Sequence, residues 1–541
     1  MGDSTVMSKR STFNLSDLFR IVADAVPDNV ALISGERCLR YRQLEERATR
    51  LALWLRAKGI GAGDTVGIHT YNSTEFVETY LAACKLKAVP FNINFRYTVD
   101  ELRYLYANAE LKALIYHTDL DSLNTGALSA APGIRALMCF GGSDKPTING
   151  AVLYEDALAA ASGSLDDIDL SDDDIVLLYT GGTTGKPKGV MWPHKALFYA
   201  ALGGSLGLKG PVVSPEELAV RAKGGMSIKL MPTAPLIHGA GLWATLNSLL
   251  SGNTVVLDGQ PSFNAERILD IVAADKVNVM TIVGDAMGFP LLDALKANPG
   301  RWDLSRLMAL ISSSALFSEH VQQGLKELLP PNIRMSNGMG GSETGQVGTT
   351  NDSAKEGLMS LARNDTVDVA VDGVRFARPG ETGILVRMGH VPIGYFKDPK
   401  KTAEIFVTIE GKHCSISGDS ARLQADGTIT IFGRDSQCIN TGGEKVFVEE
   451  VEEALHSYDG IVDAVVVGLP DERWGQKVVA IIALRPGLTE DGEAIKAHAR
   501  RNLAGYKVPK NIVIVPKVLR TPVGKADYSW AKATAEQQLQ G

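Results

Sequence analysis

A glycine- and hydroxyl-rich loop with two lysines carries the clearest chemical signal in this sequence. Residues 179–189 read YTGGTTGKPKG and directly follow the apolar run 175–178. Glycines let backbone N–H groups approach an anion closely, while hydroxyls and lysines add donors and positive charge. The loop is therefore suited to holding a polyphosphate.

The spacing within this loop differs from that of a Walker phosphate loop. A Walker loop has four residues between its first glycine and its Gly-Lys pair, followed by Ser or Thr. Here three residues separate Gly181 from Gly185, and Pro187 follows Lys186. Because proline disfavours the α region at the residue before it, a helix cannot begin smoothly there. Taken alone, the same composition is also typical of a surface turn.

Further motifs follow the loop in order: Ser342-Glu343-Thr344, Ser417-Gly418-Asp419, Gly433-Arg434 and Pro522-Val523-Gly524-Lys525. Together with the loop they resemble the adenylate-forming superfamily, which includes acyl-CoA synthetases, luciferases and nonribosomal adenylation domains. The resemblance covers residues 180–525, and the first 170 residues also fit in pattern. It implies an α/β fold with a large N-terminal domain of βα sheets, predicted as residues 1–433. A small mobile α+β C-terminal domain, predicted as residues 434–541, would carry the last motif.

The resemblance assigns the ATP-binding residues. The loop would close over the β- and γ-phosphates with hydroxyls, backbone donors and one charge, supplied by Thr180, Gly181, Gly182, Thr183, Thr184, Gly185 and Lys188. Asp419 would accept hydrogen bonds from both ribose hydroxyls, and Arg434 would pair with phosphate or ribose oxygens. Without this context, Asp419 would be interpreted as a turn residue and Arg434 as one partner of a surface ion pair.

Mg²⁺ is the cofactor that the resemblance implies. Glu343 and Thr184 would hold the ion, which offsets negative charge on phosphate oxygens. Ser342 replaces the more usual threonine and keeps the hydroxyl, and Met339 stands near the place where relatives stack a tyrosine on adenine. A thioether can also pack on a ring. Alone, a glutamate in a glycine-rich stretch is most often a solvated loop charge.

Lys525 is the predicted catalytic residue. By resemblance it would enter the active site from the small domain and contact the carboxylate and the α-phosphate, where negative charge develops. Its ammonium stays charged at neutral pH, so it would act as a cation and not as a base. Outside this context, a lysine near a chain end is usually a solvated charge. His238 would gate the carboxylate pocket, with a packed histidine as an equal alternative.

The predicted acceptor is the pantetheine thiol of CoA. Gly443 and Lys445 lie in a segment that resembles the lining of the thiol tunnel, and Trp474 resembles an aromatic that stacks on the CoA adenine. Lys510 would pair with a CoA phosphate. The small domain would rotate about Ser436 between the two half-reactions, because a hinge needs only a few permissive positions.

The predicted substrate is a bulky or long apolar carboxylic acid, because most side chains in the expected pocket segments 284–286, 312–314 and 338–340 are small. The sequences of residues 179–192, 311–317 and 340–345 most resemble those of bacterial CoA ligases for steroid side-chain acids. A medium- or long-chain fatty acid is the main alternative substrate. An amino-acid substrate stays possible, because Asp285 could bind its amino group. The alternative is that the Asp285 carboxylate caps a helix.

Three other functions stay open at this point. One is an acyl-AMP ligase that loads a carrier-protein phosphopantetheine, and another is a luciferase-like oxygenase. The third is a catalytically dead lipid-binding relative, against which the joint presence of Glu343, Asp419, Arg434 and Lys525 argues.

The elements that must position these motifs alternate between strand and helix in the first half of the chain, as in parallel sheets covered by helices. Strands are predicted at 66–68, 113–115, 254–257, 277–280 and 307–310, and helices at 44–55, from Ser73 to Lys85 and from Asn264. The last hundred residues predict a small α+β unit with helices near 448–455 and 490–503 and strands at 464–467, 478–484 and 512–515.

Length and composition limit the number of structural units and the class of protein. A chain of 541 residues suggests about three structural units, and 45% hydrophobic with 22% charged residues is ordinary for a soluble protein. The net charge of -7 argues against a nucleic-acid partner, and no apolar run approaches the ~20 residues of a membrane span. The polar N-terminus, five scattered cysteines and nine unclustered histidines predict a cytoplasmic protein without a zinc site. A homo-oligomer stays open.

Overall fold

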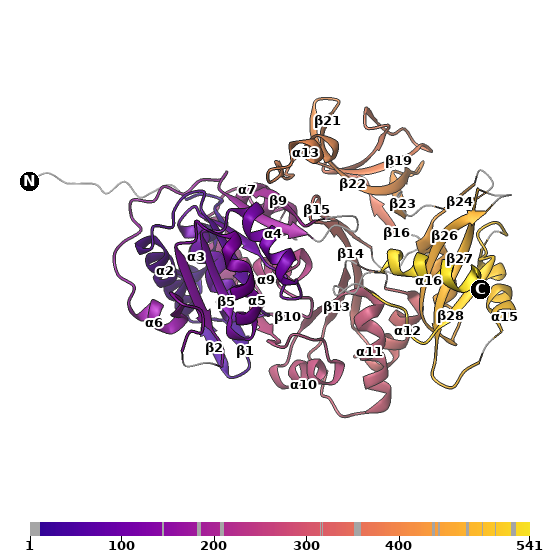
Figure 1. Ribbon diagram of the computed structural model, residues 1–541, viewed down its shortest axis with the longest axis horizontal. Coiled ribbons are helices and arrows are strands. Elements are labelled where there is room, and N and C mark those ends of the chain that lie inside the picture. The colour runs from indigo at the N-terminus through magenta and orange to yellow at the C-terminus, as the bar shows by residue number, and fades with distance from the viewer. Residues whose placement is uncertain are drawn as a thin grey trace, which may run out of the picture. The chain divides into compact units, whose positions relative to one another are not determined.

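The computed structural model describes residues 11–142, 145–180, 186–205, 210–313, 315, 317–350, 359–434, 439–441, 444–471, 475–489, 491–503, 505–520 and 526–540. The chain divides into two units, one made of Met1–Ser262 with His390–Glu404 and the other of Phe263–Gly389 with Ile405–Gly541. Figure 1 labels the elements of both units.

The main sheet of the first unit has the strand order β20-β9-β8-β4-β3-β5-β6-β7. From β4 to β7 neighbouring strands are parallel, whereas β9 runs antiparallel to both β8 and β20. The strands are β3 (Thr65–His69), β4 (Val89–Asn92), β5 (Ala113–His117), β6 (Ala136–Phe140), β7 (Val152–Leu153), β8 (Ile175–Thr180), β9 (Lys188–Pro193) and β20 (Gly394–Tyr395).

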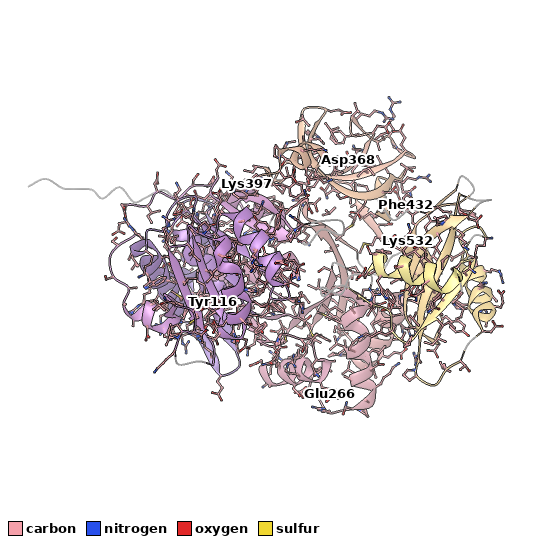
Figure 2. The ribbon with its side chains drawn as sticks, viewed as in Figure 1. Tyr116, Glu266, Asp368, Lys397, Phe432 and Lys532 are labelled. Carbon is pink, nitrogen blue, oxygen red and sulfur yellow. The ribbon has the colours of Figure 1, made fainter. Side chains whose placement is uncertain are left out.

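Helices cover both faces of this sheet because its strand side chains alternate between two apolar cores. Val66 and Ile115 pack with α2 (Tyr41–Ala57), α3 (Thr74–Lys85) and α6 (Tyr154–Ala159), whereas Leu114 and Tyr116 pack with α4 (Val99–Ala109) and α5 (Asp121–Ala127). Tyr116 is labelled in Figure 2. A parallel sheet buried on both faces is the arrangement that the alternating pattern predicts.

The predicted start of α3 is confirmed. The Ser73 hydroxyl accepts the Phe76 N–H at 3.2 Å, and the helix runs from Thr74 to Lys85. Serine is a favoured N-cap because its oxygen satisfies a donor that the first helical turn leaves without a partner.

The rest of the first unit contains four adjacent strands, in the order β10-β11-β1-β2, and their helices. Its elements are α1 (Leu15–Ala25), β1 (Val30–Ser34), β2 (Arg37–Arg40), α7 (His194–Ala201), α8 (Glu217–Gly224), β10 (Lys229–Pro232), α9 (Gly239–Leu250) and β11 (Thr254–Leu257). β11 matches the predicted strand.

The second unit opens with strands in the order β15-β14-β13-β12. Its elements are α10 (Ala265–Asp275), β12 (Val279–Ile282), α11 (Gly284–Ala297), β13 (Ala309–Ser313), α12 (Glu319–Leu328), β14 (Arg334–Gly341) and β15 (Gly345–Thr350). The predicted helix start at Asn264 is confirmed: Asn264 is the N-cap of α10, and its side chain accepts the Arg267 N–H at 2.9 Å.

Two predicted strands of this unit begin two residues too early. Val277 closes the end of α10 instead, because its N–H donates to Val272 O at 3.0 Å after Lys276 adopts a left-handed conformation with φ of 54°. Leu307 likewise closes a turn, since its N–H donates to Leu304 O at 2.9 Å. Both side chains are buried, so apolar character alone did not separate cap from strand.

A mainly antiparallel sheet follows, with the order β16-β23-β22-β19-β17-β18 and with β21 paired to β22. Its strands are β16 (Met359–Ala362), β17 (Val367–Val371), β18 (Arg375–Phe376), β19 (Thr382–Met388), β21 (Phe406–Ile409), β22 (Lys412–Leu423) and β23 (Thr428–Arg434). The helix α13 (Pro399–Ile405) precedes β21.

The C-terminal part is the predicted small α+β assembly, a five-stranded sheet with separate apolar cores against α14 and α15 and against α16. Its elements are β24 (Ile439–Thr441), β25 (Glu444–Val446), α14 (Val448–His456), β26 (Ile461–Asp471), β27 (Gly475–Leu484), α15 (Gly492–Asn502), β28 (Asn511–Val515) and α16 (Tyr528–Gln540). The domain boundary between residues 433 and 434 stays a prediction. Among the described residues, no helix is long and apolar enough to cross a membrane.

Candidate active site

The glycine-rich loop connects two antiparallel strands. Thr180 ends β8 and lies opposite Lys188, which begins β9, while Tyr179 lies opposite Gly189. A Cβ on Gly189 would come within 3.0 Å of the Tyr179 ring, so only glycine fits there without a shift. Five predicted phosphate-binding residues lie outside the described residues: Gly181, Gly182, Thr183, Thr184 and Gly185.

Asn92 ties the base of this loop to the segment that carries His238. It ends β4, is 5% exposed, and its side-chain oxygen accepts the Tyr179 N–H at 2.8 Å. Its amide nitrogen donates to Tyr179 O at 2.9 Å and to Ile237 O at 2.6 Å. One buried amide therefore satisfies backbone groups next to both Thr180 and His238.

The backbone places His238 immediately before α9. Its carbonyl accepts the Leu242 N–H at 3.0 Å, and its own N–H donates to Pro235 O at 3.0 Å. The Asn72 side chain holds the same segment from another element, accepting the Leu236 N–H at 2.7 Å. His238 is half-buried, and its role as a gate to the carboxylate pocket stays a prediction.

Asn92→Ala is expected to disturb both segments, because it leaves three buried backbone groups without their partner. Each such group costs about 1–3 kcal/mol, so the melting temperature should fall by about 4–10 °C. Turnover should fall by roughly 10- to 100-fold through misplaced binding groups. Thermal unfolding and steady-state rates measure both effects. Asn94→Ala, which removes one hydrogen bond to the Arg96 N–H, is the control and should change little; equal effects of the two variants would contradict this role.

Glu343 lies at the tip of the hairpin between β14 and β15. The Thr344 N–H donates to Gly341 O at 3.2 Å, and Gly345 follows with φ of 67°. This combination of a tight turn and a left-handed residue is a common three-residue hairpin connection. Glycine is also required at 340, where a Cβ would lie 2.3 Å from Gly345 O.

Two buried polar side chains donate hydrogen bonds to backbone carbonyls of this hairpin. The Ser415 hydroxyl donates to Glu343 O at 2.7 Å, and Arg387, opposite Ser415 across β19 and β22, donates to Gln346 O. Burial lowers the pKa of Arg387 to about 10, so it is still a cation at neutral pH. Neither residue belongs to a motif, so nothing in the sequence pattern pointed to them.

The backbones of Asp419 and Arg434 lie opposite each other in β22 and β23. They are register partners, and the Asp419 N–H donates to the Ser417 hydroxyl at 3.0 Å after Gly418 with φ of 83°. Asp419 is half-buried and lies on the same strand as Ser415, four positions further along. Strand β22 therefore links the Glu343 turn to the predicted ribose-binding pair.

Several predicted residues are less fully defined. The backbone of Lys445 lies in β25, and Ser342 is half-buried in the Glu343 turn. Lys525, Gly443, Trp474 and the predicted hinge Ser436 lie outside the described residues.

Asp285 is 4% exposed and is the second residue of α11, and its carboxylate accepts the N–H of Ser318, which lies just before α12, at 2.9 Å. Burial raises its pKa. The contact supports the capping interpretation and not an amino-acid anchor.

The residues present fit a magnesium ion that is bound mainly by substrate. Across the part of the chain that the structure describes, no three His, Cys, Asp or Glu side chains gather as a metal site. Mg²⁺ in nucleotide enzymes typically takes one or two carboxylates and completes its shell with phosphates and water. Glu343, at the tip of a well-anchored turn, can supply such a single carboxylate.

The comparisons with known proteins identify the family of this chain. The family described as AMP-binding enzyme matches residues 19–396, and the AMP-binding enzyme C-terminal domain matches residues 450–525. The chain belongs to the AMP-binding enzyme family. This AMP-binding enzyme is 41% identical to the medium-chain acyl-CoA ligase Mig of Mycobacterium avium, over 99% of this chain and 100% of that protein. It is also 41% identical to the 3-oxocholest-4-en-26-oate–CoA ligase of Rhodococcus rhodochrous, over 96% of this chain and 95% of the relative.

Solved structures share the fold of this AMP-binding enzyme. The anthranilate CoA ligase AuaEII in complex with anthranoyl-AMP matches with a TM-score of 0.84 and 22% identity, covering 98% of each chain. ATP-bound MatB from Rhodopseudomonas palustris matches with a TM-score of 0.79 and 23% identity, covering 97% of this chain and 99% of that one. The predicted adenylate-forming fold and the predicted AMP-forming acid–thiol ligase are confirmed; the roles of single site residues stay predictions.

Proposed function

We propose that this ligase activates a bulky or long apolar carboxylic acid, either a steroid side-chain acid or a medium- to long-chain fatty acid, and transfers it to CoA. The observation that carries the proposal is the 41% identity, over nearly the whole chain, to relatives named as ligases for these acids. The same names disfavour a carrier-protein acceptor, an oxygenase and an inactive lipid-binding protein. Cytoplasmic location and oligomeric state stay predictions.

In the first half-reaction the acid carboxylate attacks the α-phosphorus of ATP, which forms acyl-AMP and releases pyrophosphate. The loop between β8 and β9 would hold the β- and γ-phosphates, and Asp419 and Arg434 would hold the ribose. Lys525 would stabilise negative charge on the α-phosphoryl as the bond to pyrophosphate breaks. Glu343 and Thr184 would hold Mg²⁺. The ion would offset negative charge on the phosphate oxygens and so stabilise the leaving pyrophosphate.

In the second half-reaction the CoA thiolate attacks the acyl carbonyl, and AMP leaves with its bonding electrons. Gly443 would let the pantetheine arm pass close to the backbone, with Lys445 and Trp474 beside it. A small hollow of about 120 Å³ on the C-terminal part is lined by three cations, Lys496, Arg500 and Lys510. Lys496 and Arg500 also pair with Glu493, at 2.9 and 3.7 Å, so the support for a contact with a CoA phosphate comes mainly from Lys510 itself.

Lys510→Glu is expected to raise KM for CoA by about tenfold, since a charge-assisted hydrogen bond is lost and a repulsion is added. ATP–pyrophosphate exchange driven by the acid should stay unchanged, because CoA takes no part in it. Steady-state thioester assays and isotope exchange measure the two quantities. Lys517→Glu makes the same charge change at an exposed position outside the hollow and is the control. A tenfold loss in both half-reactions would refute the assignment.

A panel of acids tests the proposed substrate class. Acetate, hexanoate, decanoate, palmitate, benzoate and a steroid acid with its carboxylate at C26 are each supplied with ATP, Mg²⁺ and CoA, and AMP release is measured. The proposal predicts the highest kcat/KM for the steroid acid or for the medium- and long-chain fatty acids. Preference for acetate or benzoate would reject it. Replacing CoA with a phosphopantetheinylated carrier protein tests the acceptor in the same assay.

A further inference from the structure

A segment from distant sequence lies along the base of the glycine-rich loop. Gly394 and Tyr395 in β20 pair with Met191 and Val190 in β9, and the Phe396 N–H donates to Gly189 O at 2.8 Å. Lys397, labelled in Figure 2, follows directly. The next residue, Asp398, therefore reaches the start of β9.

Asp398 is held in place by its own turn. Its carbonyl accepts the Thr402 N–H at 3.0 Å and the Thr402 hydroxyl at 2.8 Å, and its Oδ1 accepts the Lys401 N–H at 3.0 Å. A Cβ on Gly394 would lie 2.6 Å from the Thr402 side chain, so the turn tolerates little rearrangement. The Oδ2 atom meets a partner outside this turn.

That partner is Lys188, the predicted phosphate-binding lysine. Its Nζ makes an ion pair and hydrogen bond with Asp398 Oδ2, and it lies 6.0 Å from the centre of the Tyr395 ring. The hydrogen bond from Lys188 lowers the pKa of Asp398, so the carboxylate is charged at neutral pH. Asp398 therefore balances the charge of Lys188.

We propose that Asp398 is a positioning residue that holds the Lys188 ammonium at the base of the loop until nucleotide binds, when a phosphate oxygen displaces the carboxylate. The inference rests on the proposed function. The exposed fractions of the two side chains are 41% for Lys188 and 29% for Asp398, and an ion pair this exposed to water is weak. A polyphosphate offers several anionic oxygens and makes stronger charge-assisted bonds.

The exchange leaves no orphaned charge. Released Asp398 keeps the Lys401 N–H on Oδ1 and stays open to water, so it does not become an unpaired buried anion. Asp398 therefore keeps Lys188 in position but weakens ATP binding, because the ion pair must break before a phosphate oxygen can bind the lysine. Its removal should tighten nucleotide binding, which is the opposite of what loss of a purely structural contact would do.

The test is MgATP binding to the full chain, without acid or CoA, measured by calorimetry. Asp398→Asn keeps an oxygen for the Lys401 N–H and removes the charge, and the Kd for MgATP should fall about fivefold. The effect should vanish in a Lys188→Met background, because there is then no lysine to release. Asp398→Ser, a second neutral side chain with an acceptor oxygen, should also tighten binding, and Asp398→Glu should stay near the wild-type Kd.

A neighbouring ion pair provides the matched control. Lys397 in the same segment pairs with Glu110 at 2.5 Å, and Glu110→Gln removes an equivalent carboxylate without touching Lys188. Its Kd for MgATP should equal that of the wild type. Unchanged or weaker MgATP binding by both neutral Asp398 variants, or tightening that persists with Lys188→Met, would overturn the proposal. Failure of the wild type to bind MgATP would instead reject the proposed function.

Discussion

Lys525→Ala is expected to slow acyl-AMP formation by about 10²- to 10³-fold, the loss typical of removing one preorganised charge from a transition state. Negative charge grows on the α-phosphoryl as pyrophosphate leaves, and alanine offers nothing to balance it. ATP–pyrophosphate exchange with the best acid of the panel measures this step directly. Thioester formation from synthetic acyl-AMP and CoA bypasses it and should be much less affected.

Lys532→Ala is the control for charge and location. Lys532 is an exposed lysine on α16 of the same C-terminal part, labelled in Figure 2. Its removal should leave both half-reactions within about twofold of the wild type, as is usual for surface substitutions. An exchange rate unchanged by Lys525→Ala would show that the charge in the transition state comes from another residue.

Glu343→Gln is expected to reduce adenylation by a similar factor, about 10²- to 10³-fold, because an amide oxygen cannot supply an anionic ligand to Mg²⁺. The turn should survive the change, since Ser415 holds the backbone carbonyl of residue 343 and not its side chain. The Mg²⁺ concentration for half-maximal exchange should rise as well, which separates loss of a metal ligand from general damage.

Glu327→Gln, at an exposed position on α12, is the control for loss of one carboxylate in the same unit. It should change neither the exchange rate nor its Mg²⁺ dependence. A Glu343→Gln enzyme with a normal Mg²⁺ dependence would remove Glu343 from the metal site, whatever its rate.

Local chemistry made part of this structure predictable. The predicted helix starts at Ser73 and Asn264 depend on a side chain bonding within its own first helical turn, and both starts are confirmed. Thr180 and Lys188, which flank the glycine-rich segment, lie opposite each other in adjacent antiparallel strands. The family was predictable because several motifs occur in its characteristic order between residues 180 and 525.

The supporting residues of the site were not predictable in this way. Asn92 bonds to residues 87 and 145 positions away, and Ser415 bonds to a residue 72 positions away. Asp398 meets Lys188 across 210 positions. Such partners are set by strand register and by a segment that returns to an earlier sheet, and no local pattern encodes either. Buried polar side chains outside motifs, such as Arg387, are the signal to examine in related sequences.

The most direct measurement is the product balance of the complete reaction. The full chain is supplied with a steroid acid whose carboxylate is at C26, or with decanoate, together with ATP, Mg²⁺ and CoA, and acyl-CoA, AMP and pyrophosphate are quantified together. The proposed function predicts that the three products appear in equal amounts and that no AMP forms without the acid. Formation of ADP and phosphate, or AMP release with no thioester from any acid of the panel, would contradict it.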